Sequence, residues 1–448
     1  MFLKKDKFLI VGISKSGIGA AELLLSKGAK CYIYDDGSTP SVIKAQKDLA
    51  EKGAVVVSKD ELGDAIDTVD VVVLSPGVAI DHEIPVKAKR NGKRIIGELE
   101  LASMFCKAPI VAVTGTNGKT TTCSMIDCIL KSCGMESVLC GNIGTPLSSV
   151  LNELTDDSIV VAEVSSFQLE TVSRFTPHIA IVTNITPDHL SRHYNMENYI
   201  FIKSRIMQCQ RESEYAVLNY DDPTVRKMSE KCKAKIVYFS TKSEVDGAYV
   251  SNGKIFYKGK YVMDTSAVQL SGEHNLENAL SAICACEILG LGEEEISQHI
   301  SEFKGVKHRI QFIKEFDGVD YYNDSKATNA DATVKAIDAM KKPTVLILGG
   351  KDKGLNYEGL FEKIKKSCVR HVVLTGESRY RLMESASDCE YYSVSMTEDF
   401  ETAIDLAKMI ANKGDAVLFS PACSSFDRFS DFEERGDNFI SIVENFNG

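Results

Sequence analysis

Short apolar runs alternate with helical stretches along the first hundred residues. The runs cover residues 7–13, 30–34, 69–74 and 94–96, and residues 17–27 have a helical pattern. Short β-branched runs separated by helices are typical of a parallel sheet with helices on its faces. This pattern predicts a Rossmann-like α/β domain over residues 1–98.

The strand–helix pattern restarts twice. From about residue 99, strands are expected at 109–114, 159–164 and 179–183, with helices at 119–132 and 197–210. Residues 247–263 alternate with period two, and their Asn-Gly and Lys-Gly turns predict antiparallel hairpins. Further strands are expected at 319–323, 345–348, 371–374 and 416–419. We therefore predict a central parallel-sheet domain of the P-loop ATPase type over 99–305, with a small antiparallel element, and a Rossmann-like domain over 306–448.

Charge and composition exclude several classes of protein. The 448 residues carry a net charge of −11, which argues against a nucleic-acid binder. No segment has the roughly 20 apolar residues that span a membrane. The thirteen cysteines are odd in number, scattered and without a CxxC pair, so reduced thiols are expected, with Cys284 and Cys286 as small packing residues. These features predict a cytoplasmic protein that binds neither nucleic acid nor membrane.

The strongest local feature is the segment Ala112-Val-Thr-Gly-Thr-Asn-Gly-Lys-Thr-Thr121. A strand enters a glycine turn, and a Lys-Thr pair opens a helix, so backbone N–H groups and the helix N-terminus can hold phosphates. Lys119 would lie between the β- and γ-phosphates, and the Thr120 hydroxyl would bind Mg²⁺. Val113 stands where a full Walker motif has its first glycine, so a purely structural turn is the alternative.

Other polar residues give weaker signals. Gly12-Ile-Ser-Lys-Ser-Gly-Ile-Gly19 follows a strand without spelling GxGxxG, and Asp35 and Asp36 end the second strand, where a ribose-binding acid often lies. Glu163 ends a central strand and could reach a ligand crevice, and Asp188-His189 follows the next strand. Taken singly, each is more typical of a tight turn, a helix cap or a solvated loop.

Taken together, the motifs resemble those of Mur ligases. The resemblance is carried by the phosphate turn and by segments that follow it in order: 141–144 (GNIG), 163–170 (EVSSFQLE), 184–190 (NITPDHL), 199–206 (YIFIKSRI), 272–279 (GEHNLENA), His308-Arg309 and 322–329 (YNDSKATN). Residues 420–429 (SPACSSFDRF) and the Gly12–Gly17 turn resemble the branch of the family that adds D-glutamate. The ordered set spans essentially the whole chain.

The resemblance implies three domains and one reaction. The first domain would hold the UDP moiety, the second ATP, and the third D-glutamate. The carboxylate of UDP-N-acetylmuramoyl-L-alanine would attack the γ-phosphate of ATP, and the amine of D-glutamate would displace phosphate from the acyl phosphate. The resemblance thus implies an ATP-dependent amide ligase of peptidoglycan synthesis, and we expect it to act as a monomer.

The resemblance also implies site residues. The catalytic group would comprise Lys119, Glu163, His189 and Lys203. One Mg²⁺ would lie on Thr120 and Glu163, and a second near Glu163, His189 and a CO₂-derived carbamate on Lys203. By pattern alone, Lys203 would be a solvated lysine on a helix.

The remaining implied residues fall into three sets. ATP would contact Gly115, Thr116, Asn117, Gly118, Lys119, Thr120, Thr121, Asn275, Asn278, Arg309, Asp324 and Lys326. The UDP-substrate would contact Lys15, Ser16, Asp35, Asp36, Ser75, Gly77, Asn142 and His189. D-Glutamate would contact Thr328, Lys353, Ser425 and Phe432.

One departure and three rival functions accompany this interpretation. Some relatives place an arginine after the second strand to pack on uracil, where this chain has Asp35-Asp-Gly37. The rivals are a sister Mur ligase or folylpolyglutamate synthase, a nucleotide-gated binding module without ligase activity, and a dinucleotide oxidoreductase. The 420–429 segment argues against a sister ligase or a folylpolyglutamate synthase. The residues between 184 and 203 argue against a binding module, because a nucleotide switch does not need the second metal site that they imply. The incomplete GxGxxG pattern after the first strand argues against an oxidoreductase.

Overall fold

The computed structural model describes residues 6–142, 144–270, 272–352, 354 and 356–446. The chain divides into two compact units, Met1–Lys304 and Gly305–Gly448. Each unit is described by itself.

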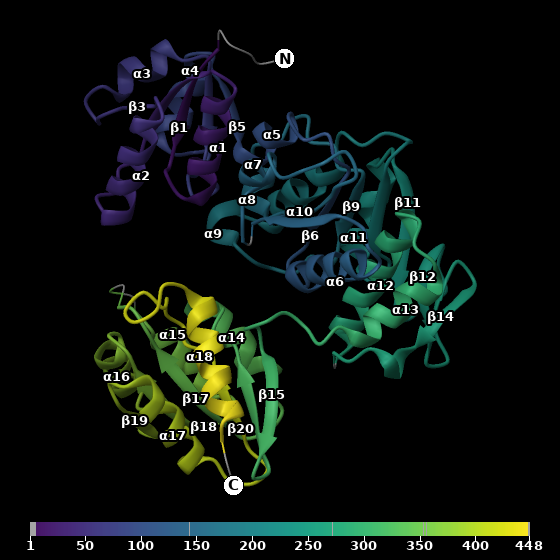
Figure 1. Cartoon of the computed structure of the whole chain (residues 1–448), viewed down its shortest axis with the longest axis vertical. Helices are drawn as coiled ribbons and strands as arrows, with labels where there is room; N and C mark the ends of the chain where they lie inside the picture. The colour runs from purple at the N-terminus through teal and green to yellow at the C-terminus, as the bar shows by residue number, and fades with distance from the viewer. Residues whose placement is uncertain (1–5, 143, 271, 353, 355, 447–448) are drawn as a thin grey trace. The chain divides into compact units, whose positions relative to one another are not determined.

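The first sheet of unit 1 is parallel, with strand order β3-β2-β1-β4-β5. Its strands are β1 (Lys7–Val11), β2 (Lys30–Tyr34), β3 (Val55–Val56), β4 (Val71–Leu74) and β5 (Arg94–Gly97), and its helices are α1 (Lys15–Ser26), α2 (Pro40–Glu51), α3 (Leu62–Thr68) and α4 (Glu83–Arg90). The strand order reverses between β1 and β4, and ligands of such sheets bind at the carboxyl ends beside that point. The predicted Rossmann-like arrangement is confirmed (Figure 1).

The second sheet of unit 1 has strand order β14-β13-β12-β11-β10-β9-β6-β8-β7. Its strands are β6 (Ile110–Thr114), β7 (Ser137–Gly141), β8 (Ile159–Glu163), β9 (Ile179–Val182), β10 (Tyr215–Asn219), β11 (Lys235–Ser240), β12 (Gly247–Ser251), β13 (Lys254–Tyr257) and β14 (Lys260–Asp264). β6 lies between β8 and β9, and all three are completely buried. The phosphate turn therefore starts from a buried interior strand of the sheet.

Helices surround this sheet (Figure 1). They are α5 (Glu98–Ser103), α6 (Lys119–Ser132), α7 (Leu147–Val150), α8 (Ser166–Leu169), α9 (Leu190–His193), α10 (Met196–Ser204), α11 (Pro223–Met228), α12 (Glu273–Ile288) and α13 (Glu293–Glu302), with 3₁₀ turns η1 (Arg205–Met207), η2 (Ser229–Lys231) and η3 (Thr265–Ala267). The helix predicted over 197–210 ends at Ser204 and continues as one 3₁₀ turn. Cys284 and Cys286 are fully buried on α12, as predicted.

The predicted hairpins are confirmed: β12, β13 and β14 pair antiparallel. Asn252 and Gly253 both have positive φ, at 51° and 73°, and so do Lys258 and Gly259, at 48° and 84°. Two consecutive residues with positive φ form the tight turn whose twist suits a two-residue hairpin.

The sheet of unit 2 has strand order β15-β16-β20-β17-β18-β19, with only β15 antiparallel to its neighbour. Its strands are β15 (Gln311–Phe316), β16 (Val319–Asn323), β17 (Thr344–Gly349), β18 (Val369–Thr375), β19 (Val394–Met396) and β20 (Ala416–Phe419), and its helices are α14 (Ala330–Ala339), α15 (Glu358–Lys365), α16 (Arg379–Asp388), α17 (Phe400–Ile410) and α18 (Phe432–Glu444). Two apolar clusters, one on each face of the sheet, form its core.

Six strands were not predicted from the sequence: β3, β7, β10, β11, β15 and β19. β7, β15 and β19 contain exposed or half-buried positions, and both residues of β3 are exposed. Such short, mixed runs have no periodicity that separates them from loops. β10 and β11 are more apolar and complete the central sheet.

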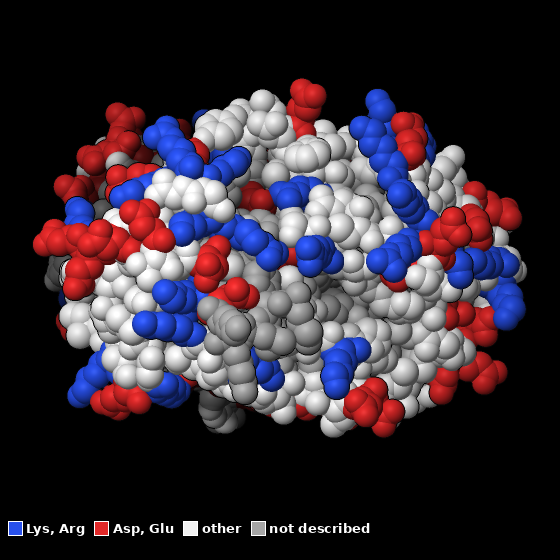
Figure 2. Space-filling view, turned by 90° about the horizontal axis from the view of Figure 1, so that it is seen from above, with Lys and Arg blue, Asp and Glu red and all other residues white. Residues whose placement is uncertain are grey.

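All thirteen cysteines lie in the described part of the chain and are free thiols. Within those same ranges, no helix is both long and apolar enough to cross a membrane. On the face shown in Figure 2, basic side chains are interspersed with acidic ones.

Candidate active site

The turn between β6 and α6 requires glycine at two positions. Gly118 has φ +85°, and a Cβ there would lie 2.2 Å from Asn278 Oδ1. Gly115 has φ +148°, and its Cβ would lie 1.9 Å from Thr183 Oγ1. Both the positive φ and the close neighbours exclude larger residues. The two glycines therefore let the turn pack closely against Thr183, after β9, and against Asn278 on α12.

Residues that follow β9 hold the turn in place. Thr116 N donates to Asn184 O (2.8 Å), and Asn117 N donates to Asn184 Oδ1 (2.8 Å). Thr183 Oγ1 donates to Asn117 O (2.6 Å). Thr183 and Asn184 were not predicted as site residues, although a polar pair directly after a buried strand is a usable signal.

Lys119 lies within the turn that it was predicted to complete. Its Nζ donates to Gly115 O (3.0 Å) and Thr116 O (2.9 Å). The ammonium group therefore lies over the backbone of the turn, and a bound phosphate would offer a stronger, charged acceptor.

Thr120, Glu163 and Asn142 meet at the carboxyl ends of β6, β7 and β8. Thr120 Oγ1 donates to Glu163 Oε2 (2.8 Å), and Asn142 Nδ2 donates to Glu163 Oε1 (3.0 Å). Thr120 and Glu163 are buried. A hydroxyl and a carboxylate are the hard oxygen donors that Mg²⁺ prefers. Among the described residues, no group of three or more His, Cys, Asp and Glu side chains could hold a metal ion, so these oxygens would need further ligands from elsewhere.

Lys203 is buried beside the turn, with 2% of its surface exposed. Its Nζ donates to Gly115 O (2.8 Å) and to Thr114 Oγ1 (3.4 Å), and it lies 4.9 Å from the centre of the Tyr199 ring. Burial and then the nearby charge of Lys119 lower the pKa of Lys203 well below its ordinary value. The solvated lysine that the pattern alone suggested is thus wrong.

His189 is more exposed, with 51% of its side-chain surface accessible. It has a left-handed backbone at φ 52°, and its ring packs on Phe167 with centroids 4.9 Å apart. His193, one helical turn later, is buried; its Nε2 lies 3.0 Å from Ser166 Oγ and its Nδ1 3.5 Å from Glu170 Oε1. Burial lowers the pKa of His193 to about 4, so this second histidine is neutral at pH 7.

The residues predicted to face UDP gather at the carboxyl ends of β1, β2 and β4. Asp35 Oδ2 accepts from Ile13 N (2.5 Å) and Asp35 Oδ1 from Gly37 N (2.8 Å). Ser75 Oγ donates to Gly12 O (2.6 Å). Asp35 and Ser75 therefore shape the turns around the switch point, whereas Lys15, Asp36 and Gly77 are exposed there and Ser16 is half-buried.

In unit 2, several predicted residues gather where β16 and β20 end. Asp324 is buried; its Oδ2 accepts from Ser420 Oγ (2.6 Å) and its Oδ1 from Ile310 N (3.1 Å). Burial raises the pKa of Asp324 to about 7. Lys326 Nζ lies 5.5 Å from the centre of the Phe432 ring. Arg309 is exposed beside this group.

The other residues of unit 2 and of α12 are placed as follows. Ser425 is buried in the loop after β20, and Thr328 is half-buried in the loop after β16. Asn278 Nδ2 donates to Asn275 Oδ1 (3.2 Å), and Asn278 Oδ1 accepts from Thr122 Oγ1 (3.4 Å), on the α6 side of the turn. Thr121 is half-buried on the first turn of α6. Lys353 lies outside the described residues.

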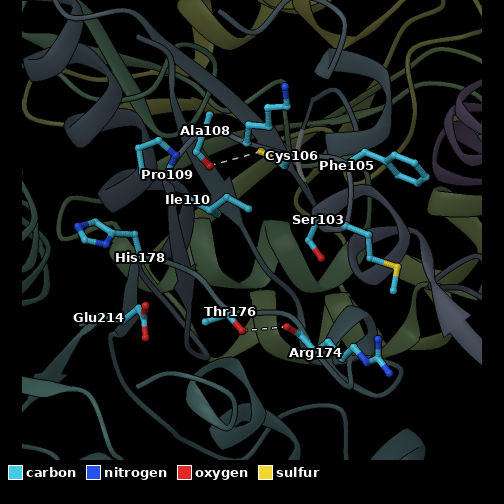
Figure 3. A pocket seen from close by; sticks show the side chains of 12 residues that line it. Ser103, Phe105, Cys106, Ala108, Pro109, Ile110, Arg174, Thr176, His178 and Glu214 are labelled. Atoms are coloured by element: carbon cyan, nitrogen blue, oxygen red, sulfur yellow. Dashed lines mark hydrogen bonds between the residues drawn. The ribbon is translucent and has the colours of Figure 1, made fainter. Parts of the chain in front are cut away.

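A cavity of about 510 Å³ lies at the other end of the central sheet. Cys106, Ile110, Arg174, His178 and Glu214 are among its lining residues, close to where β6, β9 and β10 begin (Figure 3). None of the predicted site residues lines it. Because the phosphate turn follows the carboxyl end of β6, this cavity is separated from the turn by the length of the strand.

The sequence matches known families along most of its length. Residues 6–97 match the MurD-like N-terminal domain of Mur ligases, residues 113–286 the Mur ligase middle domain, and residues 308–423 the glutamate ligase domain of Mur ligases. Among curated proteins, the UDP-N-acetylmuramoylalanine–D-glutamate ligase of Caldanaerobacter subterraneus subsp. tengcongensis is 42% identical over 446 residues, which cover 99% of both chains. The ligase of the same name from Clostridioides difficile is 38% identical over 454 residues, covering 99% of this chain and 100% of the relative.

Solved structures share the fold at lower identity. The UDP-N-acetylmuramate-alanine ligase MurC of Thermotoga maritima is 20% identical with a TM-score of 0.54, covering 98% of this chain and 99% of that one. MurF of Acinetobacter baumannii is 18% identical with a TM-score of 0.56, covering 86% and 92%. Together with the three sheets and the phosphate turn, these matches show that the chain belongs to the Mur ligase family, in the branch of the UDP-N-acetylmuramoylalanine–D-glutamate ligases.

Proposed function

We propose that this chain is a cytoplasmic enzyme that joins D-glutamate to UDP-N-acetylmuramoyl-L-alanine at the expense of ATP, in peptidoglycan synthesis. The substrate carboxylate attacks the γ-phosphorus and ADP leaves; the amine of D-glutamate then attacks the acyl phosphate, forming the amide and releasing inorganic phosphate and a proton. Magnesium, when bound, neutralises phosphate oxygens during the first step.

The observation that carries this proposal is a cluster of catalytic groups around one phosphate turn. Lys119 and Lys203 both donate to Gly115 O, at 3.0 and 2.8 Å. Thr120, in the first turn of α6, donates to Glu163, at the end of β8, at 2.8 Å. Bringing a carboxylate to a triphosphate requires cations that are fixed before the reaction, because reorganising them would cost energy.

We assign the hydroxyl of Thr120 and the carboxylate of Glu163 as ligands of one Mg²⁺. Their mutual hydrogen bond keeps both oxygens in place, and Asn142 Nδ2 holds the other carboxylate oxygen at 3.0 Å. A residue that orients a metal ligand in this way supports its geometry. His189, as a partly exposed imidazole on the loop after β9, is assigned to the second ion and to the sugar–alanine portion.

We assign Lys203 as the site of a carbamate. Carbamylation needs an unprotonated amine, because only the neutral nitrogen has a lone pair to attack CO₂. The lowered pKa of Lys203 supplies that form, and the product is an anion that can bind a metal. Because this anion is buried, it would need a cation beside it, which Mg²⁺ or Lys119 can provide.

For unit 2 we assign Asp324 to the ATP ribose, and Arg309 and Lys326 to the phosphates. Thr328, Lys353, Ser425 and Phe432 are assigned to D-glutamate. These roles require unit 2 to approach the phosphate turn during the reaction, as in other enzymes whose sites assemble on closure. Small-angle scattering with an ATP analogue and UDP-N-acetylmuramoyl-L-alanine should show a more compact chain; an unchanged profile would contradict the closure.

The first sheet is assigned to UDP, with Lys15, Ser16, Asp35, Asp36, Ser75 and Gly77 around the β1/β4 switch point. We place the domains at 1–98, 99–305 and 306–448. The first is assigned to the UDP-substrate, the second to ATP and the third to D-glutamate. Because both oxygens of Asp35 accept backbone N–H groups, its role is to shape the site rather than to replace an arginine that packs on uracil.

Phosphate release tests the function directly. The purified chain is given ATP, Mg²⁺, UDP-N-acetylmuramoyl-L-alanine and one amino acid at a time. Turnover is expected with D-glutamate and not with L-lysine or diaminopimelate. Turnover with L-lysine or diaminopimelate, and not with D-glutamate, would assign the chain as a sister ligase. If none of these amino acids supports phosphate release, a binding module without ligase activity would be favoured.

A further inference from the structure

Arg192 connects two regions of unit 1 that are far apart in sequence. Its Nε and Nη2 donate to Glu170 Oε1 (3.0 Å) and Oε2 (2.7 Å), so the guanidinium forms a bidentate pair of hydrogen bonds with the carboxylate. The same Nη2 also donates to Val78 O (3.0 Å) and approaches Pro76 O (3.5 Å). Val78 lies in the loop after β4, and Arg192 lies on α9 of the second sheet.

The geometry makes this contact a fixed one. Glu170 is 3% exposed and Arg192 17% exposed, so water competes little with the pair. The guanidinium also lies 4.9 Å from the centre of the Phe167 ring. A planar guanidinium that bridges a carboxylate and a backbone carbonyl while packing on an aromatic ring has little freedom to rotate.

Each end of the contact leads to a part of the proposed substrate site. On one side, Ser75, at the start of the same loop, donates to Gly12 O in the glycine turn after β1. On the other side, His189 lies one helical turn before Arg192, and its ring packs on Phe167, the ring that Arg192 covers. The loop after β4, which is proposed to bind UDP, and His189 are therefore linked through the side chain of Arg192.

A second, weaker link runs in parallel. The Tyr194 hydroxyl donates to Asp81 Oδ2, again between the segment around α9 and the loop that follows β4. Tyr194 is 67% exposed, so this bond is open to water and contributes less.

We propose that Arg192 is a positioning residue that fixes the UDP-binding loop of residues 75–78 relative to His189, and so sets the span over which a UDP-linked substrate can reach from its nucleotide to its reacting carboxylate. This inference rests on the proposed function. A long substrate held at both ends loses affinity when the two ends of its site shift, whereas ATP, bound at the phosphate turn, is unaffected.

The test compares Arg192→Lys with Arg205→Lys. Lysine keeps the positive charge but cannot form the bidentate hydrogen bonds with the Glu170 carboxylate. Arg205 is the matched control, because its guanidinium also donates to backbone carbonyls, Glu170 O and Val172 O, but both lie in the second-sheet region. Phosphate release is measured against UDP-N-acetylmuramoyl-L-alanine, ATP and D-glutamate in turn.

Arg192→Lys is expected to raise the KM for UDP-N-acetylmuramoyl-L-alanine about tenfold, which is the loss of one good charged hydrogen bond. The kcat and the KM for ATP should stay within about twofold, and Arg205→Lys should change none of the three. Tyr194→Phe removes the exposed hydrogen bond to Asp81 and should raise the KM for UDP-N-acetylmuramoyl-L-alanine by about twofold to threefold. This variant provides the test if Arg192→Lys does not fold.

Three results would overturn the inference: an unchanged KM for the UDP-substrate, an equal rise in the KM for ATP, or the same rise in Arg205→Lys. If Arg192→Lys does not fold, an unchanged KM in Tyr194→Phe overturns it. Failure of the proposed function is a different observation, since the wild-type chain would then release no phosphate with D-glutamate at all.

Discussion

Replacing Asp324 by asparagine should make unit 2 more stable, and increasingly so as pH rises. The Asp324 carboxyl is 4% exposed, and burial raises its pKa from 3.8 to about 7. An acid with a raised folded-state pKa holds its proton more tightly when folded. Its contribution to stability is therefore full below about pH 3.8 and is lost as pH rises toward 7.

The size of the effect follows from the two pKa values. Each pH unit between them costs about 1.4 kcal/mol of unfolding free energy. Between pH 5 and pH 8 the wild type should therefore lose roughly 3 kcal/mol relative to Asp324→Asn. The variant keeps an acceptor for Ile310 N and a polar neighbour for Ser420, so little else changes.

Urea unfolding of the full chain at pH 5, 6, 7 and 8, followed by circular dichroism, measures this difference. Asp388→Asn is the control, because Asp388 is exposed at the end of α16 and its carboxylate is solvated in both states. A difference between wild type and Asp324→Asn that stays flat across the range, or that is matched by Asp388→Asn, would refute the reasoning.

Three further outcomes concern the phosphate turn. Lys203→Ala should lose most phosphate-release activity without rescue by high bicarbonate, because no amine remains to be carbamylated; near-normal turnover would defeat the carbamate assignment. Gly118→Ala should weaken ATP binding at least about tenfold by calorimetry, since φ is +85° and the new Cβ would lie 2.2 Å from Asn278 Oδ1. Thr120→Ala should raise the Mg²⁺ concentration for half-maximal rate about tenfold and leave the KM for UDP-N-acetylmuramoyl-L-alanine unchanged; an unchanged Mg²⁺ requirement would remove Thr120 from the metal site.

The amino-acid sequence by itself determined the class of fold and the position of the phosphate turn. Continuous apolar runs such as Ile110–Thr114 are typical of buried strands, and glycines at 115 and 118 before a Lys-Thr pair mark the turn. The Asn-Gly and Lys-Gly pairs determined the two hairpins. These features are local, because backbone conformation and side-chain period are set by residues close together in the chain.

The tertiary structure decided the features that depend on distant segments. Helical period alone places Lys203 on a helix, but its burial depends on the turn at Gly115 and on Tyr199. Nothing near Arg192 in sequence indicates Val78, 114 residues away. Burial, shifted pKa values and bidentate contacts arise from groups that only folding brings within a few ångströms, so the pattern of neighbours along the chain does not contain them.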